Sequence, residues 1–316
     1  MEGKTLFVFE HLKIALFPSL SAIHIFIIMN KYHQIFNDRL AILGTMHHKE
    51  KAIAPILEQE LGIKILVPPN FNTDVFGTFT REVKRPDVQI ATARLKAEKA
   101  LEVTGEKLAI ASEGSFAPHP FLPYIYANRE VVILLDKQND LEIIGEEFSV
   151  DTNFNHQLIE NIPEAYNFAQ KVGFPEHGLI IYYEELTNNN PQIIKGITTE
   201  EQLLEAINLV FHNSQIVKVY IETDMRALYN PTRMKNIEKA TVNLIKKINN
   251  CCPQCTAPGF EITQRIQGLP CEICHTPTTL TLAVIYQCKK CSFIQKQLFP
   301  DAIEFANPSQ CMYCNP

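Results

Sequence analysis

All nine cysteines of this 316-residue chain lie at or after position 251, and eight of them form four Cys-x-x-Cys pairs. Each pair presents two thiolates from one tight turn, and two pairs complete a closed four-cysteine zinc shell. Residues 251–316 are therefore predicted to form a double zinc ribbon with two structural Zn²⁺ ions. The pairs are Cys252/Cys255, Cys271/Cys274, Cys288/Cys291 and Cys311/Cys314, with Cys251 left over.

The spacing leaves two pairings of these knuckles open. Successive pairs are 15, 13 and 19 residues apart, so the first pair with the second and the third with the fourth fits the usual ribbon interval. The run TLAVIYQCKKC, a strand leading into a knuckle, instead favours a nested arrangement with the second and third pairs inside. We favour nesting. Disulfides and an open catalytic ion are weaker interpretations, because the body of the chain has no cysteine and the thiolates fill both shells.

The charge balance argues against a general affinity for polyanions. The net charge is -6, and residues 251–316 contain four Lys or Arg against four Asp or Glu. A neutral ribbon lacks the footprint of a phosphate-binding surface, so nucleic acid is not favoured as a partner. The ribbon is better interpreted as a scaffold or a protein contact.

The N-terminal segment 1–38 is predicted to be an extension to the folded chain. Its stretch 14–30 carries no formal charge and is rich in Ile, Leu and Phe, as in a signal peptide or membrane anchor. Pro18 and His24 interrupt it, and it lacks a basic leader. We favour a non-native extension, with Met29 as the true start of the protein, over a packed segment or a membrane anchor. We therefore expect a cytoplasmic protein with no membrane association.

Residues 39–250 alternate short apolar runs with amphipathic stretches, which is typical of an α/β domain with a mixed, twisted sheet flanked by helices. A loop is predicted over 113–123 and a turn over 188–191. Strands are predicted at 39–45, 63–67, 107–112, 130–136, 141–148, 178–183 and 216–221, and helices at 49–61, 92–104, 163–173, 199–211 and from 230 onward.

Polar clusters follow three of these strands, at the strand ends where α/β proteins bind ligands. Thr45 and Lys49 lie at a helix N-terminus, where a hydroxyl, an ammonium and backbone N–H groups suit an anion. Glu113 and Ser115 flank a glycine, and a carboxylate there can hold magnesium or orient water. The plainer interpretations are a solvated turn and an ordinary β-turn.

A third cluster follows the strand at 216–221. Arg226 and Arg233 suit bidentate phosphate binding, and Asp224 can supply a second metal ligand. The plainer interpretation is an Asp–Arg ion pair that stabilises the turn.

Arg81 in the loop 78–85 and Lys96 in the next helix add positive charge to these clusters. Together the clusters predict a positive pocket around one or two carboxylates. Such a pocket favours a phosphorylated small molecule or nucleotide bound with Mg²⁺.

From about Leu40 the chain resembles an uncharacterised, mainly bacterial family. The marks of the resemblance are TMHHKEKAIAP, FGTFTRE, ASEGSFAPHPFLP, VGFPEHGL, ETDMRALYNPTRM and the CPQC, GLPCEIC and CMYCNP segments. The resemblance covers nearly all of the domain and implies no activity.

The order GTMHHKEKAI, TARLKAEKAL, LAIASEGS is also similar to the inosine triphosphate pyrophosphatase-like superfamily, particularly its non-canonical purine nucleoside triphosphatases. This resemblance implies a Thr and a Lys that contact phosphate, a small-residue helix, and an acidic residue before a glycine that binds magnesium. Met46, His47 and Leu95 depart from the superfamily pattern. The matching positions are Thr45 and Lys49, then Ala93, Lys96 and Ala97, then Glu113 and Gly114, with Arg233 matching a basic residue that opens the final helix.

The sequence thus predicts magnesium-dependent hydrolysis of a nucleotide or related phosphoanhydride, with Glu113 and Asp224 as the catalytic carboxylates. One alternative is a non-catalytic nucleotide-binding or sensing protein. Another is an adaptor that binds nucleic acid or protein through its zinc ribbon.

Overall fold

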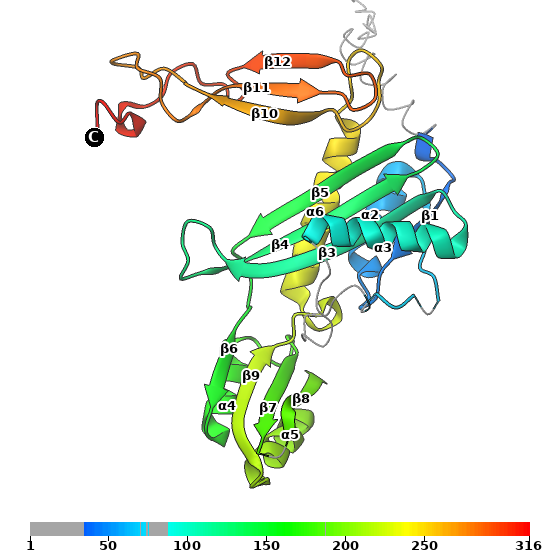
Figure 1. The fold of residues 1–316 in the computed structure, drawn as a ribbon, viewed down its shortest axis with the longest axis vertical. Helices are drawn as coiled ribbons and strands as arrows, with labels where there is room; N and C mark the ends of the chain where they lie inside the picture. The colour runs from blue at the N-terminus through cyan, green and yellow to red at the C-terminus, as the bar shows by residue number, and fades with distance from the viewer. Residues whose placement is uncertain (1–34, 70, 74, 76–87, 187) are drawn as a thin grey trace, which may run out of the picture.

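The structure, a computed structural model, describes residues 35–69, 71–73, 75, 88–186 and 188–316. The N-terminal segment with Met29 and the loop with Arg81 lie outside these residues. Three sheets follow one another along the chain: a main sheet, a second sheet inserted before the last long helix, and a C-terminal sheet. In space the main sheet lies between the other two (Figure 1).

The main sheet has the strand order β2-β1-β3-β4-β5. β1 runs parallel to both β2 and β3, whereas β3, β4 and β5 form an antiparallel meander. This confirms the predicted α/β class with a mixed sheet. The strands are β1 (Leu40–Gly44), β2 (Lys64–Leu66), β3 (Leu108–Pro118), β4 (Tyr126–Asp136) and β5 (Leu141–Ser149).

Helices cover both faces of the main sheet (Figure 1). α2 (Glu50–Leu61) and α6 (Pro231–Asn249) share one apolar core with the sheet, and α3 (Gln89–Thr104) packs a small-residue face on the other side. Gly62 and Gly105 end α2 and α3 in the left-handed conformation that glycine adopts without a Cβ penalty. Asn230 caps α6 by accepting from the Arg233 N–H at 2.9 Å, which fixes the first turn of this helix.

The predicted loop 113–123 is wrong in its first half. β3 continues to Pro118, because residues 113–118 pair one for one with β4, from Glu113 opposite Val131 to Pro118 opposite Tyr126. Gly114 and the prolines looked like loop signals. The pairing tolerates Pro118 because it is the last residue of the strand.

The inserted sheet is antiparallel, with the order β6-β9-β7-β8 and its own apolar core. The predicted turn 188–191 is wrong, since β8 begins at Asn188. β8 is an edge strand, where proline and polar residues cost little pairing. Its elements are β6 (His156–Ile159), α4 (Ile162–Lys171), β7 (Leu179–Glu185), β8 (Asn188–Ile197), α5 (Glu200–His212, with a capping box at Thr199 and Gln202) and β9 (Ile216–Thr223).

After α6 the chain forms the C-terminal module, an antiparallel sheet in the order β10-β11-β12. One Cys-x-x-Cys knuckle precedes β10, one lies between β10 and β11, one lies between β11 and β12, and one follows β12. The chain terminus lies at the end of the module far from α6 (Figure 1). The strands are β10 (Glu261–Gln267), β11 (Thr281–Gln287) and β12 (Ile294–Leu298).

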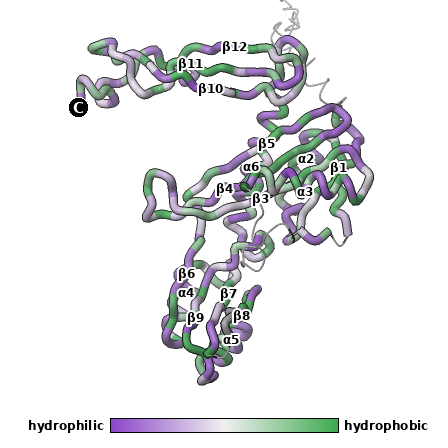
Figure 2. The backbone as a smooth tube through the Cα atoms, in the orientation of Figure 1, coloured by the Kyte–Doolittle hydropathy of each residue, from purple (hydrophilic) through white to green (hydrophobic). Residues whose placement is uncertain are grey.

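Hydropathy follows the same layers: β1, β3 and β4 consist mainly of apolar residues where helices cover these strands (Figure 2). Within the described residues, no helix has both the length and the apolar character needed to span a membrane.

Candidate functional site

The end of β1 is where polar side chains from distant parts of the chain meet. β1 stops at Gly44 opposite Ala111, so Ser112 and Glu113 of β3 extend beyond it. The connections from β1 to β2 and from β2 to β3 run in opposite directions across the sheet, which makes the carboxyl end of the β1/β3 pair the topological switch point of the order 2-1-3. Ligands of open α/β sheets bind at such a point.

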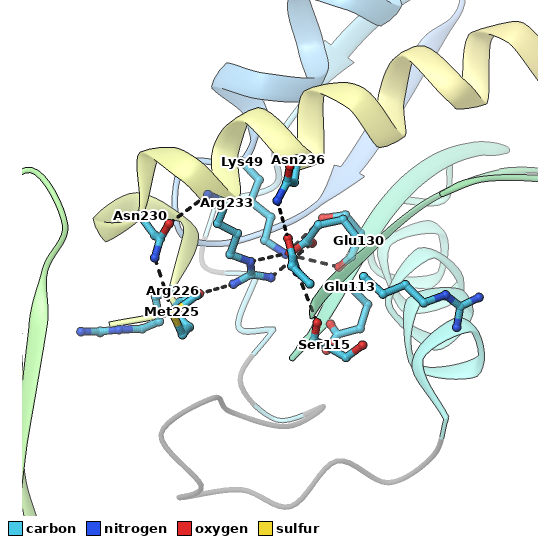
Figure 3. Close-up of polar contacts among 12 residues, drawn as sticks. Lys49, Glu113, Ser115, Glu130, Met225, Arg226, Asn230, Arg233 and Asn236 are labelled. Carbon is cyan, nitrogen blue, oxygen red and sulfur yellow. Dashed lines mark hydrogen bonds and ion pairs between the residues drawn. The ribbon is translucent and has the colours of Figure 1, made fainter. Parts of the chain in front are cut away.

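Two buried ion pairs flank this point. Lys96 Nζ on α3 lies 2.5 Å from Glu113 Oε2, and Arg233 Nε on α6 lies 2.8 Å from Glu130 Oε1. All four side chains are at most 7% exposed. Because α3 and α6 cover opposite faces, the two pairs lie on the two sides of the sheet, where β3 passes the end of β1. Figure 3 shows the side chains of Lys49, Glu113, Glu130 and Arg233 converging from four different elements.

Gly114 makes the second pair possible. It lies opposite Glu130 in the β3/β4 register. A Cβ at this position would overlap both the Arg233 guanidinium and the Glu130 carboxylate. The glycine therefore provides the space in which the ion pair is held against the sheet.

Lys49 enters the same region from the start of α2. Its ammonium lies 3.1 Å from Ser112 Oγ, and the side chain is buried. Burial, followed by the nearby charges of Arg233 and Lys96, lowers the pKa of Lys49 to about 7. A shift of that size corresponds to about 5 kcal/mol against the charged form. An anion that contacts Lys49 would restore the proton, so this corner of the site suits a negatively charged ligand.

Amide side chains complete the network. Asn128 Nδ2 donates to Glu130 Oε1 at 3.0 Å, and Asn236 Nδ2 donates to Asn128 Oδ1 at 2.9 Å. Gln89 donates to the Glu113 carbonyl at 2.7 Å and accepts from Ser115 Oγ at 3.1 Å. Asn236 Oδ1 is buried and has no hydrogen-bond partner among the described residues. The network thus keeps one unused acceptor.

Asp224 and Arg226 lie outside this network, at the junction with the inserted sheet. The Asp224 carboxylate accepts from Arg226 Nη2 at 2.6 Å, from the Arg226 backbone N–H at 3.1 Å and from the Gly196 N–H at 3.2 Å. This is the ion pair of the plainer interpretation. The metal-binding role of Asp224 and the phosphate-binding role of Arg226 stay predictions.

Of the predicted site residues, the structure brings together Lys49, Lys96, Glu113 and Arg233, and Ser115 joins them through Gln89. Thr45 is buried directly after β1, and its hydroxyl donates to the Met46 carbonyl at 2.8 Å. Arg81 lies outside the described residues. The network also contains four residues that were not predicted as site residues: Glu130, Asn128, Asn236 and Gln89. The available signal was Glu130 itself, a charged residue that directly precedes the apolar run VVILL.

The eight knuckle cysteines form two clusters. Within each cluster all sulfur atoms lie within 4.8 Å of one another, and the closest pairs are 3.6 to 3.8 Å apart. Four thiolates about 2.3 Å from one tetrahedral zinc stand about 3.8 Å apart, whereas a disulfide would bring two sulfurs to about 2.05 Å. Both clusters therefore fit a structural Zn²⁺, in agreement with the predicted ligand set.

The pairing of the knuckles is neither sequential nor nested. The first knuckle joins the third and the second joins the fourth, which gives the groups Cys252, Cys255, Cys288, Cys291 and Cys271, Cys274, Cys311, Cys314. The reason is the up-down-up path of β10, β11 and β12, which carries successive knuckles to opposite ends of the module. Of these three strands, only β11 was predicted from the sequence.

The two clusters have different surroundings. The first adjoins the apolar group Phe260, Tyr286 and Phe293, and the Phe260 N–H donates to the Asn250 carbonyl at the end of α6 at 2.8 Å. The second lies at the free end of the module. Cys251 belongs to neither cluster, and burial raises the pKa of its thiol to about 12.

Magnesium has no comparable site in the described part of the chain. There, the groups of three or more His, Cys, Asp or Glu side chains within reach of one ion are the two cysteine clusters. Glu113 and Glu130 each already face a cation. The predicted Mg²⁺ therefore remains a proposal.

A comparison with curated proteins finds no match. The similarity to the inosine triphosphate pyrophosphatase-like superfamily is not shown by the comparisons. A family model matches residues 96–316, a range that includes Lys96, Glu113, Glu130, Arg233 and all eight knuckle cysteines. The chain belongs to this family, which is described as a domain of unknown function (DUF6671).

Proposed function

We propose that the buried network at the end of β1 binds a phosphorylated small molecule, with a nucleotide as the expected class, and hydrolyses its phosphoanhydride bond with Mg²⁺. The observation that carries this proposal is the convergence of Lys49, Lys96 and Arg233 on one point of the sheet. With Lys49 protonated, the three cations outnumber Glu113 and Glu130. A phosphate group would supply the missing negative charge.

Fold stability alone is a poor reason for such a cluster. A buried ion pair often contributes no more to stability than apolar residues of the same volume. A buried lysine whose pKa is lowered to about 7, such as Lys49, destabilises the fold when it is charged. Perturbed, buried ionisable groups at a ligand-binding position of the fold instead mark a functional site. The switch point of the main sheet is such a position.

The proposed roles follow from the contacts. Lys49, Lys96 and Arg233 would neutralise phosphate oxygens, while Thr45 and Ser115 would orient the ligand. If Lys96 turns to a phosphate, Glu113 becomes available to hold the ion or to orient water. Phosphoryl transfer requires little beyond such positioning and charge neutralisation. Both cysteine clusters are closed shells, so we assign no chemistry to them.

The test uses the full chain loaded with zinc. Nucleoside triphosphates, including deaminated purines, are screened with Mg²⁺ for release of phosphate or pyrophosphate. We expect turnover that falls at least about 100-fold in Glu113→Gln and Lys49→Met, the usual effect of losing a charge-stabilising group. Lys51→Met, an exposed neighbour in α2, is the matched control and should keep full turnover.

A second candidate is a non-catalytic nucleotide-binding protein, favoured by the cation already paired with each carboxylate. Saturable nucleotide binding without turnover, lost in Lys49→Met and kept in Glu113→Gln, would support it over hydrolysis. Neither binding nor turnover across the panel would contradict both.

A further inference from the structure

The free end of the C-terminal module exposes large apolar side chains. Ile273, in the second knuckle, is 69% exposed, and Met312 and Tyr313, in the fourth, are 81% and 78% exposed. The first and third knuckles carry Pro-Gln and Lys-Lys at the equivalent positions. Large apolar residues between the two cysteines of a knuckle therefore occur only in the cluster that lies away from α6.

The segment after β12 enlarges this surface. Its backbone runs beside the second knuckle, with the Glu272 N–H donating to the Ala306 carbonyl at 3.0 Å and the Ala306 N–H donating to the Pro270 carbonyl at 2.8 Å. Phe305 directly precedes Ala306 and its ring lies 5.9 Å from that of His275, beside the second knuckle, and Ile303 is two residues further back; both are exposed. We name the five exposed residues Ile273, Ile303, Phe305, Met312 and Tyr313 the apolar tip.

A cavity of about 330 Å³ adjoins the apolar tip. It is lined by residues 276–279 and 310–313, which include Met312 and Tyr313. The surface thus offers both projecting side chains and a recess.

The surroundings of the apolar tip are acidic. Glu272, Asp301 and Glu304 are all exposed, and neither 266–288 nor 297–316 contains a Lys or Arg. Four thiolates around one divalent zinc would add a formal charge of about -2. The lysines of the third knuckle, Lys289 and Lys290, lie at the opposite end of the module.

We propose that the apolar tip is a docking surface for a basic amphipathic segment of a partner protein. Clustered large apolar side chains on a surface mark interaction sites, and Met, Tyr and Phe are enriched in protein interfaces with a polar rim. The acidic rim selects a partner whose apolar face is flanked by Lys or Arg. This inference is independent of the proposed nucleotide site.

The same charges disfavour other occupants. Nucleic acid and anionic lipid headgroups carry the sign of the rim and would be repelled. A second copy of this chain, joined through a two-fold axis, would bring two acidic tips together.

The experiment measures binding of a synthetic helical peptide of Leu and Lys at heptad spacing to the zinc-loaded full chain by fluorescence anisotropy. The matched peptide has Glu in place of every Lys. We expect the Lys peptide to bind at least about tenfold more tightly and to weaken as salt rises from 50 to 300 mM, about the range over which exposed charges become screened. Equal affinities, or no binding of the Lys peptide, would overturn the proposal.

Variants locate the contact. Met312→Ser with Tyr313→Ser should weaken binding at least about tenfold, which corresponds to the loss of a central interface anchor. Glu272→Gln with Asp301→Asn and Glu304→Gln should weaken it and flatten its salt dependence. Lys289→Gln with Lys290→Gln, at the other end, is the control and should leave affinity unchanged. Each variant is checked for an unchanged zinc content and melting temperature.

Affinity that survives the Met312 and Tyr313 changes would contradict the assignment. A wild-type dimer that those changes convert to a monomer would identify a second copy as the occupant and would also overturn it.

Discussion

Arg233 and Glu130 form a buried ion pair that ties the first turn of α6 to β4, with 2.8 Å between Nε and Oε1. The same guanidinium donates through Nη1 to the carbonyl of Met225, in the segment that returns from the inserted sheet. Asn236, one turn further along α6, donates to the Asp151 carbonyl at 3.1 Å, in the segment that enters that sheet. Both connections to the inserted sheet are thus attached to α6 beside the candidate site.

Removing both members of this pair should cost clearly less than the sum of the two single losses. Glu130→Leu or Arg233→Met leaves the other charge buried and unpaired, which should lower the free energy of unfolding by about 3 to 5 kcal/mol. The double variant should lose clearly less than the sum. Urea denaturation of the four proteins measures the coupling, and the exposed pair Lys99 and Glu102 is the control, expected to couple by about 0.5 kcal/mol or less. Additive losses at Arg233 and Glu130 would contradict the structure.

Two glycines should respond differently to alanine. At Gly145 a Cβ would collide with the backbone of α6 at Ala240 and Leu244, which cannot yield without displacing the helix from β5. At Gly114 its three nearest neighbours would be atoms at the ends of the Arg233 and Glu130 side chains. We expect Gly145→Ala to cost about 3 kcal/mol or more and Gly114→Ala about 1 to 2 kcal/mol, values typical of overpacking. Denaturant titration tests the order, and Ala117→Ser on the exposed end of β3 should stay within about 0.5 kcal/mol of the wild type.

Lys49 should make stability depend on pH above neutrality. In the unfolded chain its amine keeps its proton up to about pH 10.5, while the pKa in the folded protein is lowered to about 7. Between these values the unfolded state binds more protons, so stability contributed by this group rises with pH. Lys49→Met should therefore be more stable than the wild type at pH 6.5, with an advantage that shrinks by about 2 kcal/mol by pH 9. Lys51→Met corrects for unrelated effects, and an advantage that does not change with pH would contradict the assignment.

The sequence predicted local features well and long-range pairing poorly. The apolar runs indicated β1, β4 and β9, because a buried strand shows its character within a few residues. Glu113 and Lys49 were predicted as site residues because Glu113 follows the expected strand 107–112 and Lys49 begins the expected helix 49–61. Glu130 was missed because its partner, Arg233, is 103 residues away and only the β3/β4 register places the two beside Gly114.

The knuckle pairing shows the same limit. The cysteine pairs reveal the ligands, but which of them share an ion depends on how many strands cross between successive knuckles. β10 and β12 are largely exposed and polar, with runs such as EITQRIQ and IQKQL, so they lack the apolar signal that revealed β11. Because β10 and β12 were not recognised as strands, the crossed arrangement, in which the first knuckle joins the third and the second joins the fourth, could not be derived.

Zinc counting distinguishes the three pairings. In the crossed arrangement Cys252 and Cys288 share an ion, whereas Cys252 and Cys271 do not. Cys252→Ser with Cys288→Ser should therefore keep about one zinc per chain, and Cys252→Ser with Cys271→Ser should keep about none, since each shell needs four ligands. Sequential pairing predicts the opposite result for both variants. Nested pairing predicts loss of both ions in each. Elemental analysis of the purified proteins decides among them, with the wild type expected to hold about two.

Loss of each cluster should loosen a different part of the chain. The first cluster lies where the module meets α6 and the main sheet: the Gly259 N–H donates to the Lys247 carbonyl of α6 at 3.2 Å, and a Cβ at Gly259 would touch Ile143 of β5. Opening this cluster with Cys288→Ser should raise amide exchange in the last two turns of α6 and in β5. Opening the second with Cys311→Ser should raise exchange only in 269–280 and 299–316, since its contacts lie within the module. Hydrogen exchange followed by mass spectrometry resolves these segments. If Cys311→Ser also loosened α6, the second ion would be part of the support for the main domain, and the free end could not be treated as a separate docking surface.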